Sequence, residues 1–76
     1  LWRMDTPELK VGTIIIDNGK MGIITSVIEN GKWEEYGPFS LTKSYEIRYF
    51  DGNLTMMTEK TIDKLIERGA LEVVAQ

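Results

Sequence analysis

The 76-residue sequence contains no cysteine and no histidine. Without cysteine the chain forms no disulfide and offers no thiolate nucleophile, zinc knuckle or iron–sulfur cluster. Without histidine it lacks the commonest general base and metal ligand. A carboxylate site for a hard cation is the remaining option, and the 12 acidic residues show no calcium-loop spacing. We therefore expect a protein that is not an enzyme and has no catalytic residue, cofactor or metal site.

Positive charge and long apolar runs are also scarce. Nine basic residues stand against 12 acidic ones, for a formal net charge of −3. Binding of DNA or RNA must then depend on a local site, because the overall field opposes it. No apolar run approaches the ~18 residues of a transmembrane helix, so no membrane partner is expected. The lack of disulfides fits a cytoplasmic location.

The chain length predicts one domain over residues 1–76 and raises a question of stability. A single core below ~70–80 residues supplies about 3–5 kcal/mol, and natural proteins of this size add disulfides, metals or subunit contacts. Disulfides are excluded here and no metal ligand set is evident. The sequence therefore favours a homo-oligomer.

The first half of the chain predicts β-hairpins. The β-branched run Val11–Asp17 is typical of a strand, and Asn18-Gly19 favours a type I′ turn into a return strand over Met21–Glu29. Strict alternation places two sets of side chains on opposite faces of that strand: Met21, Ile23, Thr25 and Val27 on one, and Ile24, Ser26 and Ile28 on the other. The segment Glu29–Lys32 repeats the Asn-Gly turn chemistry, so a second tight turn is predicted there.

The middle of the chain predicts a further strand pair. Gly37-Pro38 interrupts Trp33–Leu41, which is therefore a long loop or a bent strand. Lys43–Phe50 alternates, with Tyr45, Ile47 and Tyr49 facing inward. The turn Asp51-Gly52-Asn53 then leads into a strand over Leu54–Thr58.

The end of the chain predicts a helix followed by the last strand. An apolar stripe at helical spacing indicates a helix over Glu59–Arg68, capped by Thr58 and ended by Gly69 in a left-handed conformation. Ala70–Ala75 is the final strand. In the N-terminal segment 1–10, Thr6-Pro7 can begin a short helical turn.

This order of elements predicts the fold class. Four strands in successive hairpins, one short helix and a fifth strand indicate a mainly β protein, a small five-stranded SH3-like barrel. The segment Val11-Gly12-Thr13-Ile14-Ile15, followed by Gly19 and Met21-Gly22-Ile23-Ile24, resembles the KOW-type opening of such barrels. The likeness covers about residues 10–28.

A second resemblance is to Sm-like proteins of the divergent kind found in bacterial viruses. Arg68-Gly69 before an apolar last strand resembles their second signature, and Phe50-Asp51-Gly52-Asn53 resembles part of their first. The resemblance implies a ring that binds RNA or another nucleic acid through Arg68, Gly69 and Asn53. The chain departs from the family in the short spacing between Asp51 and Asn53 and in the helix before Arg68.

Adjacent apolar pairs point to the subunit contact. Neighbouring residues of a strand point to opposite faces of the sheet, so Met56 and Met57 cannot both face the core of a single chain. The same holds for Val73 and Val74. Edge-to-edge pairing of Leu54–Thr58 with Ala70–Val74 of a neighbour would bury these exceptions, as in Sm-like rings. The predicted oligomer interface comprises Leu54, Met56, Met57, Leu71, Val73 and Val74.

Other interpretations of these residues remain open. Trp33, Tyr36 and Phe39 either cover one end of the barrel or bind a protein partner, which would make the chain an interaction module within a larger assembly. Arg68-Gly69 is equally typical of an ordinary helix end, and Asp51-Gly52-Asn53 of an ordinary turn. The basic stripe Lys60, Lys64 and Arg68 alternates with acids, as on a solvated helix face.

Overall fold

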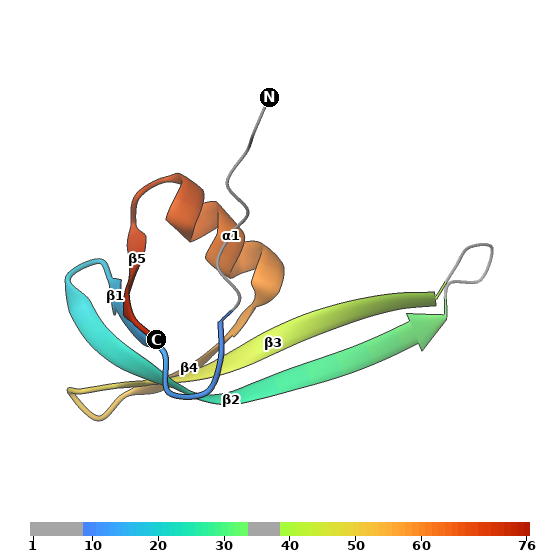
Figure 1. The fold of residues 1–76 in the computed structure, drawn as a ribbon, viewed down its shortest axis with the longest axis horizontal. Coiled ribbons are helices and arrows are strands. Elements are labelled where there is room, and N and C mark those ends of the chain that lie inside the picture. Colours follow the sequence, from blue (N-terminus) through green and yellow to red (C-terminus); the bar gives the residue numbers. More distant parts are fainter. Residues whose placement is uncertain (1–8, 34–38) are drawn as a thin grey trace.

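The computed structural model describes residues 9–33 and 39–76 and consists of five strands and one helix (Figure 1). In chain order the elements are β1 (Ile14–Asp17), β2 (Lys20–Trp33), β3 (Phe39–Tyr49), β4 (Leu54–Thr58), α1 (Glu59–Glu67) and β5 (Leu71–Ala75). All strands belong to one antiparallel sheet with the order β4-β3-β2-β1-β5. The prediction of a mainly β fold with a short helix before the last strand is confirmed. The sheet is open, with β4 at one end and β5 at the other.

Two of the predicted turns are confirmed. Asn18 and Gly19 have φ values of 51° and 83°, as a type I′ turn requires. At the second turn the Gly52 N–H donates to the Tyr49 carbonyl, and the Tyr49 N–H donates to the Asn53 carbonyl. Gly52 has a φ of 98°, so this connection is a three-residue hairpin loop that closes with a bulge.

The first strand is shorter than predicted. Strand β1 begins at Ile14, because the chain turns at Gly12, which has a φ of 96°. The Thr13 N–H donates to the Lys10 carbonyl, and the Lys10 N–H donates to Thr13 Oγ1. Val11 therefore lies in a turn and is exposed.

The prediction of a second Asn-Gly turn is wrong. Asn30 pairs with Thr42 and Gly31 with Leu41, so β2 continues to Trp33 and β3 already begins at Phe39. Neither Asn30 nor Gly31 adopts a positive φ. The Thr42 hydroxyl also donates to the Asn30 carbonyl over 3.3 Å. An Asn-Gly pair permits a tight turn, but here continued pairing with a strand of matching length prevails.

The result is a two-stranded arm formed by the distal parts of β2 and β3, which projects beyond the helix (Figure 1). Strand β4 ends opposite Ser44, so β3 from Phe39 to Lys43 has no β4 partner. The predicted interruption at Gly37-Pro38 lies outside the described residues.

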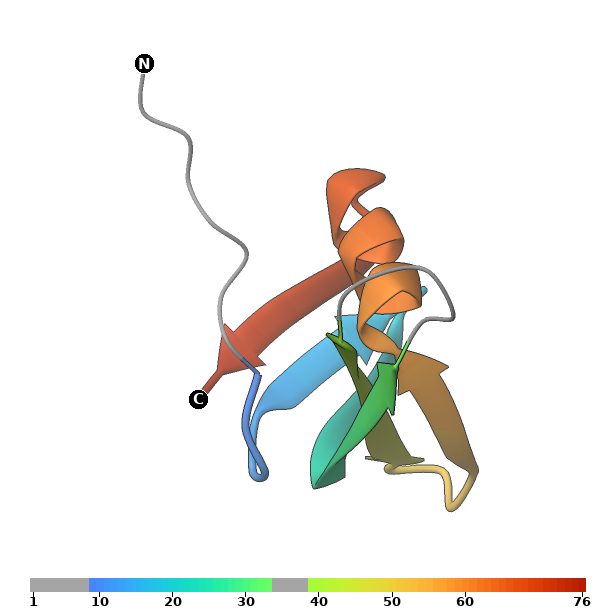
Figure 2. The same ribbon diagram turned by 90° about the vertical axis from the view of Figure 1, so that its right-hand side faces the viewer.

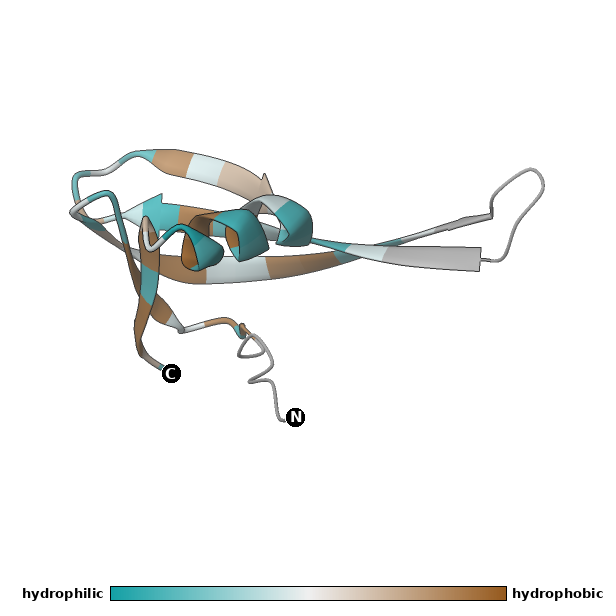
Figure 3. Ribbon diagram, turned by 90° about the horizontal axis from the view of Figure 1, so that it is seen from above, coloured by the Kyte–Doolittle hydropathy of each residue, from teal (hydrophilic) through white to brown (hydrophobic). Residues whose placement is uncertain are grey.

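The core lies between the sheet and α1 (Figure 2). Tyr45, Ile47 and Tyr49 face inward from β3 and are 2%, 0% and 7% exposed, which confirms their predicted direction. Figure 3 shows the apolar residues concentrated in the strands beside the more hydrophilic helix. The other buried apolar residues are Leu9, Ile15, Ile24, Ile62 and Leu71. Within the described part of the chain, no helix has the length and apolar character needed to cross a membrane.

The alternation predicted for the second strand fails beyond Ile24. The register with β3 shifts between Ile24 and Ser26, so Thr25 is the extra residue of a β-bulge. The bulge returns Val27 to the side of Ile24, and both contact the core. A sequence pattern with a period of two cannot reveal such an insertion.

Helix α1 has the predicted ends. The Thr61 N–H donates to the Thr58 hydroxyl, which caps the first turn. At the other end the helix stops at Glu67, one residue earlier than predicted, and Arg68 is its C-cap. The N–H groups of Gly69 and Ala70 donate to the carbonyls of Ile66 and Leu65. This pair of bonds is a Schellman motif, which explains why Gly69 has a φ of 77°.

We expect Gly22→Ala to destabilise the fold by about 1–3 kcal/mol, because it adds a methyl group to a filled space. A Cβ atom at Gly22 would lie 3.0 Å from Ile47 Cγ2 and 3.0 Å from Tyr49 Cδ1. Urea unfolding followed by circular dichroism measures the loss. The exposed arm substitution Asn30→Ala is the control, and equal midpoints for the two variants would contradict the close packing.

Candidate functional site

The two ends of the open sheet are the first candidate site. Because Tyr49 and Asn53 form a hydrogen-bonded pair, the bonded pairs that follow along β3 and β4 are Ile47 with Thr55 and Tyr45 with Met57. The alternate residues of β4 therefore direct their backbone N–H and C=O groups away from β3. These outward groups belong to Leu54, Met56 and Thr58.

The side chains at the β4 edge are also open to solvent. Leu54 and Met56 are each 54% exposed, whereas Met57 is half-buried against the core. The predicted division of Met56 and Met57 between two faces is confirmed. No residue of β4 carries a charge. Charged side chains and prolines are the usual protection of an edge strand, and β4 has neither.

The β5 edge offers a shallow apolar groove. Its lining combines the end of α1 with β5 and the adjacent strand β1 and comprises Ile16, Ile66, Gly69, Leu71, Glu72, Val73 and Val74. Val74 is 51% exposed, Val73 is half-buried against the core and Leu71 is 1% exposed. Leu71 is thus a core residue, although the sequence placed it among the interface residues. Glu72 is the single charge on this strand.

The residues predicted to bind nucleic acid do not lie together in one chain. Arg68 and Gly69 end the helix, whereas Asn53 lies in the turn between β3 and β4, and Figures 1 and 2 both show these segments well apart. The Asn53 side-chain amide donates to Asp51 Oδ2 over 3.1 Å. The Asn53 backbone N–H, together with Lys20, holds the pKa of Asp51 below its usual value. The Asn53 side chain therefore has a structural partner within its own turn.

The helix presents three cations to solvent. Lys60, Lys64 and Arg68 are exposed, and none of them forms an ion pair with another described residue. Lys64, Glu67 and Arg68 line a shallow surface depression near the helix end. Acidic side chains alternate with these cations, so the helix face is mixed in charge. Of the three cations, Arg68 is the one that the sequence assigned to nucleic-acid binding.

The predicted aromatic site falls on the arm. Tyr36 lies outside the described residues, as do the side chains of Trp33 and Phe39. The backbones of Trp33 and Phe39 are paired in register at the far end of β2 and β3. Nearer the core, Lys43 Nζ lies 3.9 Å from Glu29 Oε1 across the same two strands.

Sequence reasoning missed a polar contact inside the sheet. The Tyr49 hydroxyl donates to Asp17 Oδ2 over 2.7 Å, and Lys20 Nζ lies 5.3 Å from the centre of the Tyr49 ring. Burial and the contact with Asp17 raise the pKa of Tyr49 well above its usual range. Tyr49 therefore stays protonated and ties β3 to the first hairpin. The 32-residue separation of Tyr49 and Asp17 left no local signal for this contact.

The described residues contain no group of three or more acidic side chains placed to hold a metal ion. No protein-family model, curated protein or solved structure matches the chain. The likeness to Sm-like and KOW-type barrels therefore depends on the residues quoted above and on the order of the strands.

Proposed function

We propose that this chain is a non-catalytic Sm-like module that assembles head to tail into a ring through β4 and β5. The proposal is based on the two different strand edges at the ends of one open sheet, of which β4 has no charge and β5 has one. Within the described part of the chain, neither edge has a partner strand. A neighbouring copy offers each edge the strand it lacks.

The arrangement of the edges determines the type of assembly. A contact between β4 of one copy and β5 of the next uses two different surfaces, so it is heterologous and generates a closed ring or a filament. Strand addition would satisfy the outward backbone groups of Leu54, Met56 and Thr58. It would also cover Leu54, Met56 and Val74, which are the exposed apolar side chains of the two edge strands. A neighbour's strand beside each edge would continue the sheet from one copy to the next around the ring.

Molar mass in solution tests the ring. We expect light scattering at micromolar concentration to give a multiple of the 8.7 kDa chain mass greater than two. A mass of 8.7 kDa would contradict the proposal. The chain would then be better interpreted as a protein-interaction module that uses the arm, on which Trp33 and Phe39 are paired.

The proposed ligand of the ring is RNA, bound along the exposed face of α1. Its support is the row of cations Lys60, Lys64 and Arg68, which have no carboxylate partner among the described residues and so remain available to phosphates. A ring would present several copies of this row to one RNA strand. Multivalent contact raises the apparent affinity for RNA, although the chain as a whole is mildly acidic.

We expect Arg68→Ala to weaken binding of a fluorescent single-stranded RNA several-fold and to reduce the salt slope by about one. The matched control is Lys10→Ala, which removes one exposed cation away from α1. Anisotropy titrations at several salt concentrations measure both quantities. Equal affinity and slope for the two variants would exclude Arg68 as a phosphate contact.

A further inference from the structure

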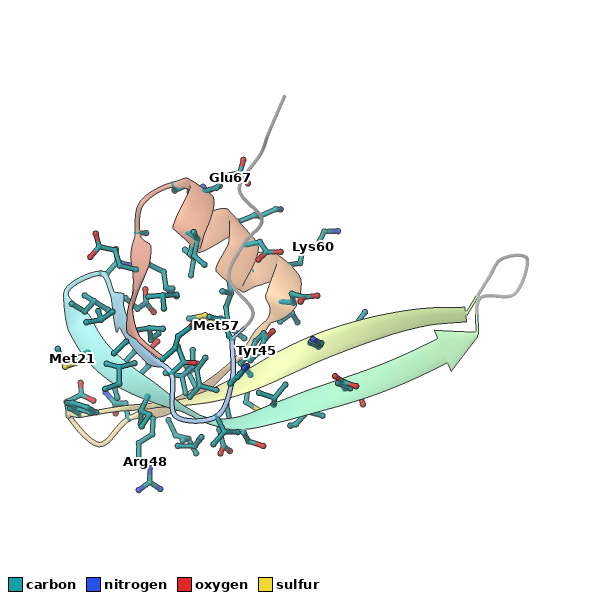
Figure 4. All side chains as sticks on the ribbon, viewed as in Figure 1. Met21, Tyr45, Arg48, Met57, Lys60 and Glu67 are labelled. Atoms are coloured by element: carbon teal, nitrogen blue, oxygen red, sulfur yellow. The ribbon has the colours of Figure 1, made fainter. Side chains whose placement is uncertain are left out.

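The face of the sheet opposite the helix is unusually apolar. Tyr45 and Met57 point toward α1, whereas Arg48 points away from it (Figure 4). An antiparallel sheet with one covered face normally carries polar side chains on the other. Here that second face, called the outer face below, carries Met21, Ile23, Phe50, Leu54 and Met56 around the charged pair Glu46 and Arg48.

The strand register places these side chains in adjacent rows. Leu54 pairs with Arg48, and Arg48 pairs with Ile23, so these three form one row across β4, β3 and β2. In the next row Met56 pairs with Glu46. On the other side of Arg48, the Phe50 N–H donates to the Met21 carbonyl, which aligns these two residues.

The apolar members of the outer face are exposed to a degree that indicates a missing partner. Phe50 is 62% exposed, Leu54 and Met56 are 54% exposed, and Met21 is 40% exposed. Large apolar side chains that cluster on one exposed surface mark interaction sites in soluble proteins. A single sheet commonly buries a second apolar face by packing against another sheet.

Two charges of opposite sign lie at the centre of this face. Arg48 and Glu46 are two residues apart on β3, about 7 Å along the strand, and both side chains point outward. Arg48 forms no ion pair with any described residue. Glu46 Oε1 accepts a hydrogen bond from the Thr25 hydroxyl and has no described cation partner.

We propose that the outer face binds the outer face of a second copy of this chain. A two-fold axis that lies in the interface and crosses β3 at right angles, midway between Arg48 and Glu46, places each Arg48 opposite the partner's Glu46. The same operation places Leu54 of each copy opposite the partner's Met56. Each face thus supplies Arg48 to one pair and Glu46 to the other, which makes the face self-complementary, as an isologous interface requires.

The charged pair of this interface is independent of the sheet edges, whereas Leu54 and Met56 belong to the β4 edge as well. Strand β3 is paired on both sides within the chain, so Arg48 and Glu46 take no part in strand addition at β4 or β5. If the edges remain free, the outer faces give a dimer, and loss of the outer-face contact halves its molar mass. If the edges form a ring, the outer faces connect one ring to others, and loss of the contact lowers the molar mass to that of a single ring.

Charge reversal and its compensation test the proposal. We expect Arg48→Glu to lower the molar mass measured by light scattering, to half the wild-type value if that is a dimer, because the carboxylate introduced by this substitution would face the partner's Glu46. Glu46→Arg is expected to have the same effect, because two guanidinium groups would then repel each other. The double variant R48E/E46R restores the opposite charges and should regain the wild-type mass.

Lys60→Glu is the matched control, because it changes the net charge by the same amount on the opposite, helical side of the sheet. It is expected to keep the wild-type mass, and circular dichroism verifies that all variants are folded. An unchanged mass for folded Arg48→Glu would overturn the proposal. So would a folded double variant that remains at the lower mass of Arg48→Glu.

Discussion

Replacing Met56 with proline is expected to reduce the assembly to two copies at most, while each chain keeps its fold. The outward N–H of Met56 is one of the donors that a neighbouring β5 would need. Proline removes that donor and places its ring on the free edge. Proline is tolerated on edge strands where the missing N–H faces solvent, so the bonds between β4 and β3 are retained.

Thr55→Pro is the matched control for this experiment. The N–H of Thr55 points toward β3, because Thr55 and Ile47 form a bonded pair in the hairpin. Thr55→Pro should therefore destabilise the chain itself. Light scattering and thermal unfolding separate the two effects. A folded Met56→Pro variant that retains a wild-type mass above two copies would contradict pairing through β4.

Replacing Ile47 with alanine is expected to unfold the isolated chain. Ile47 is 0% exposed near the end of β3, where its side chain packs over Gly22. Loss of a buried isoleucine to alanine costs about 2–5 kcal/mol, which is comparable to the ~3–5 kcal/mol that a core of this size supplies. The variant should therefore fold only where assembly adds stability.

Urea unfolding at several protein concentrations measures this effect. Because assembly stabilises the folded chain by mass action, the midpoint for Ile47→Ala should rise with concentration. Thr42→Ala is the control, since Thr42 lies exposed on the arm and contributes one 3.3 Å hydrogen bond. A cooperative Ile47→Ala transition at the wild-type midpoint would show that the core has been misidentified.

The sequence predicted the elements whose signals are local. The Asn18-Gly19 turn, the Thr58 cap and the Gly69 helix end depend on nearby residues, and all three are confirmed. The inward direction of Tyr45, Ile47 and Tyr49 followed from alternation over one regular strand.

The errors concern features that depend on the partner strand. Asn30-Gly31 has the composition of a turn, yet β3 is long enough to pair with it, and no local pattern reports that length. The bulge at Thr25 is likewise a property of the β2–β3 register. Neither feature can be read from the residues of β2 alone.

The candidate interfaces were predictable to different extents. The adjacent apolar pairs Met56-Met57 and Val73-Val74 predicted strands with an exposed apolar side chain. In the structure these strands are β4 and β5, the outer strands of the sheet. The outer face was not foreseen. Leu54, Arg48 and Ile23 come from three strands, and their adjacency emerges only from the register.

Residue-level amide hydrogen exchange of the wild-type chain tests the central claim, that the free sheet edges pair between copies. The N–H groups of Thr55 and Met57 point toward β3 and should exchange slowly in any folded state. We expect the outward N–H groups of Leu54 and Met56 to be protected as well, because they donate hydrogen bonds to a neighbouring strand. Fast exchange at Leu54 and Met56 beside slow exchange at Thr55 and Met57 would contradict edge pairing.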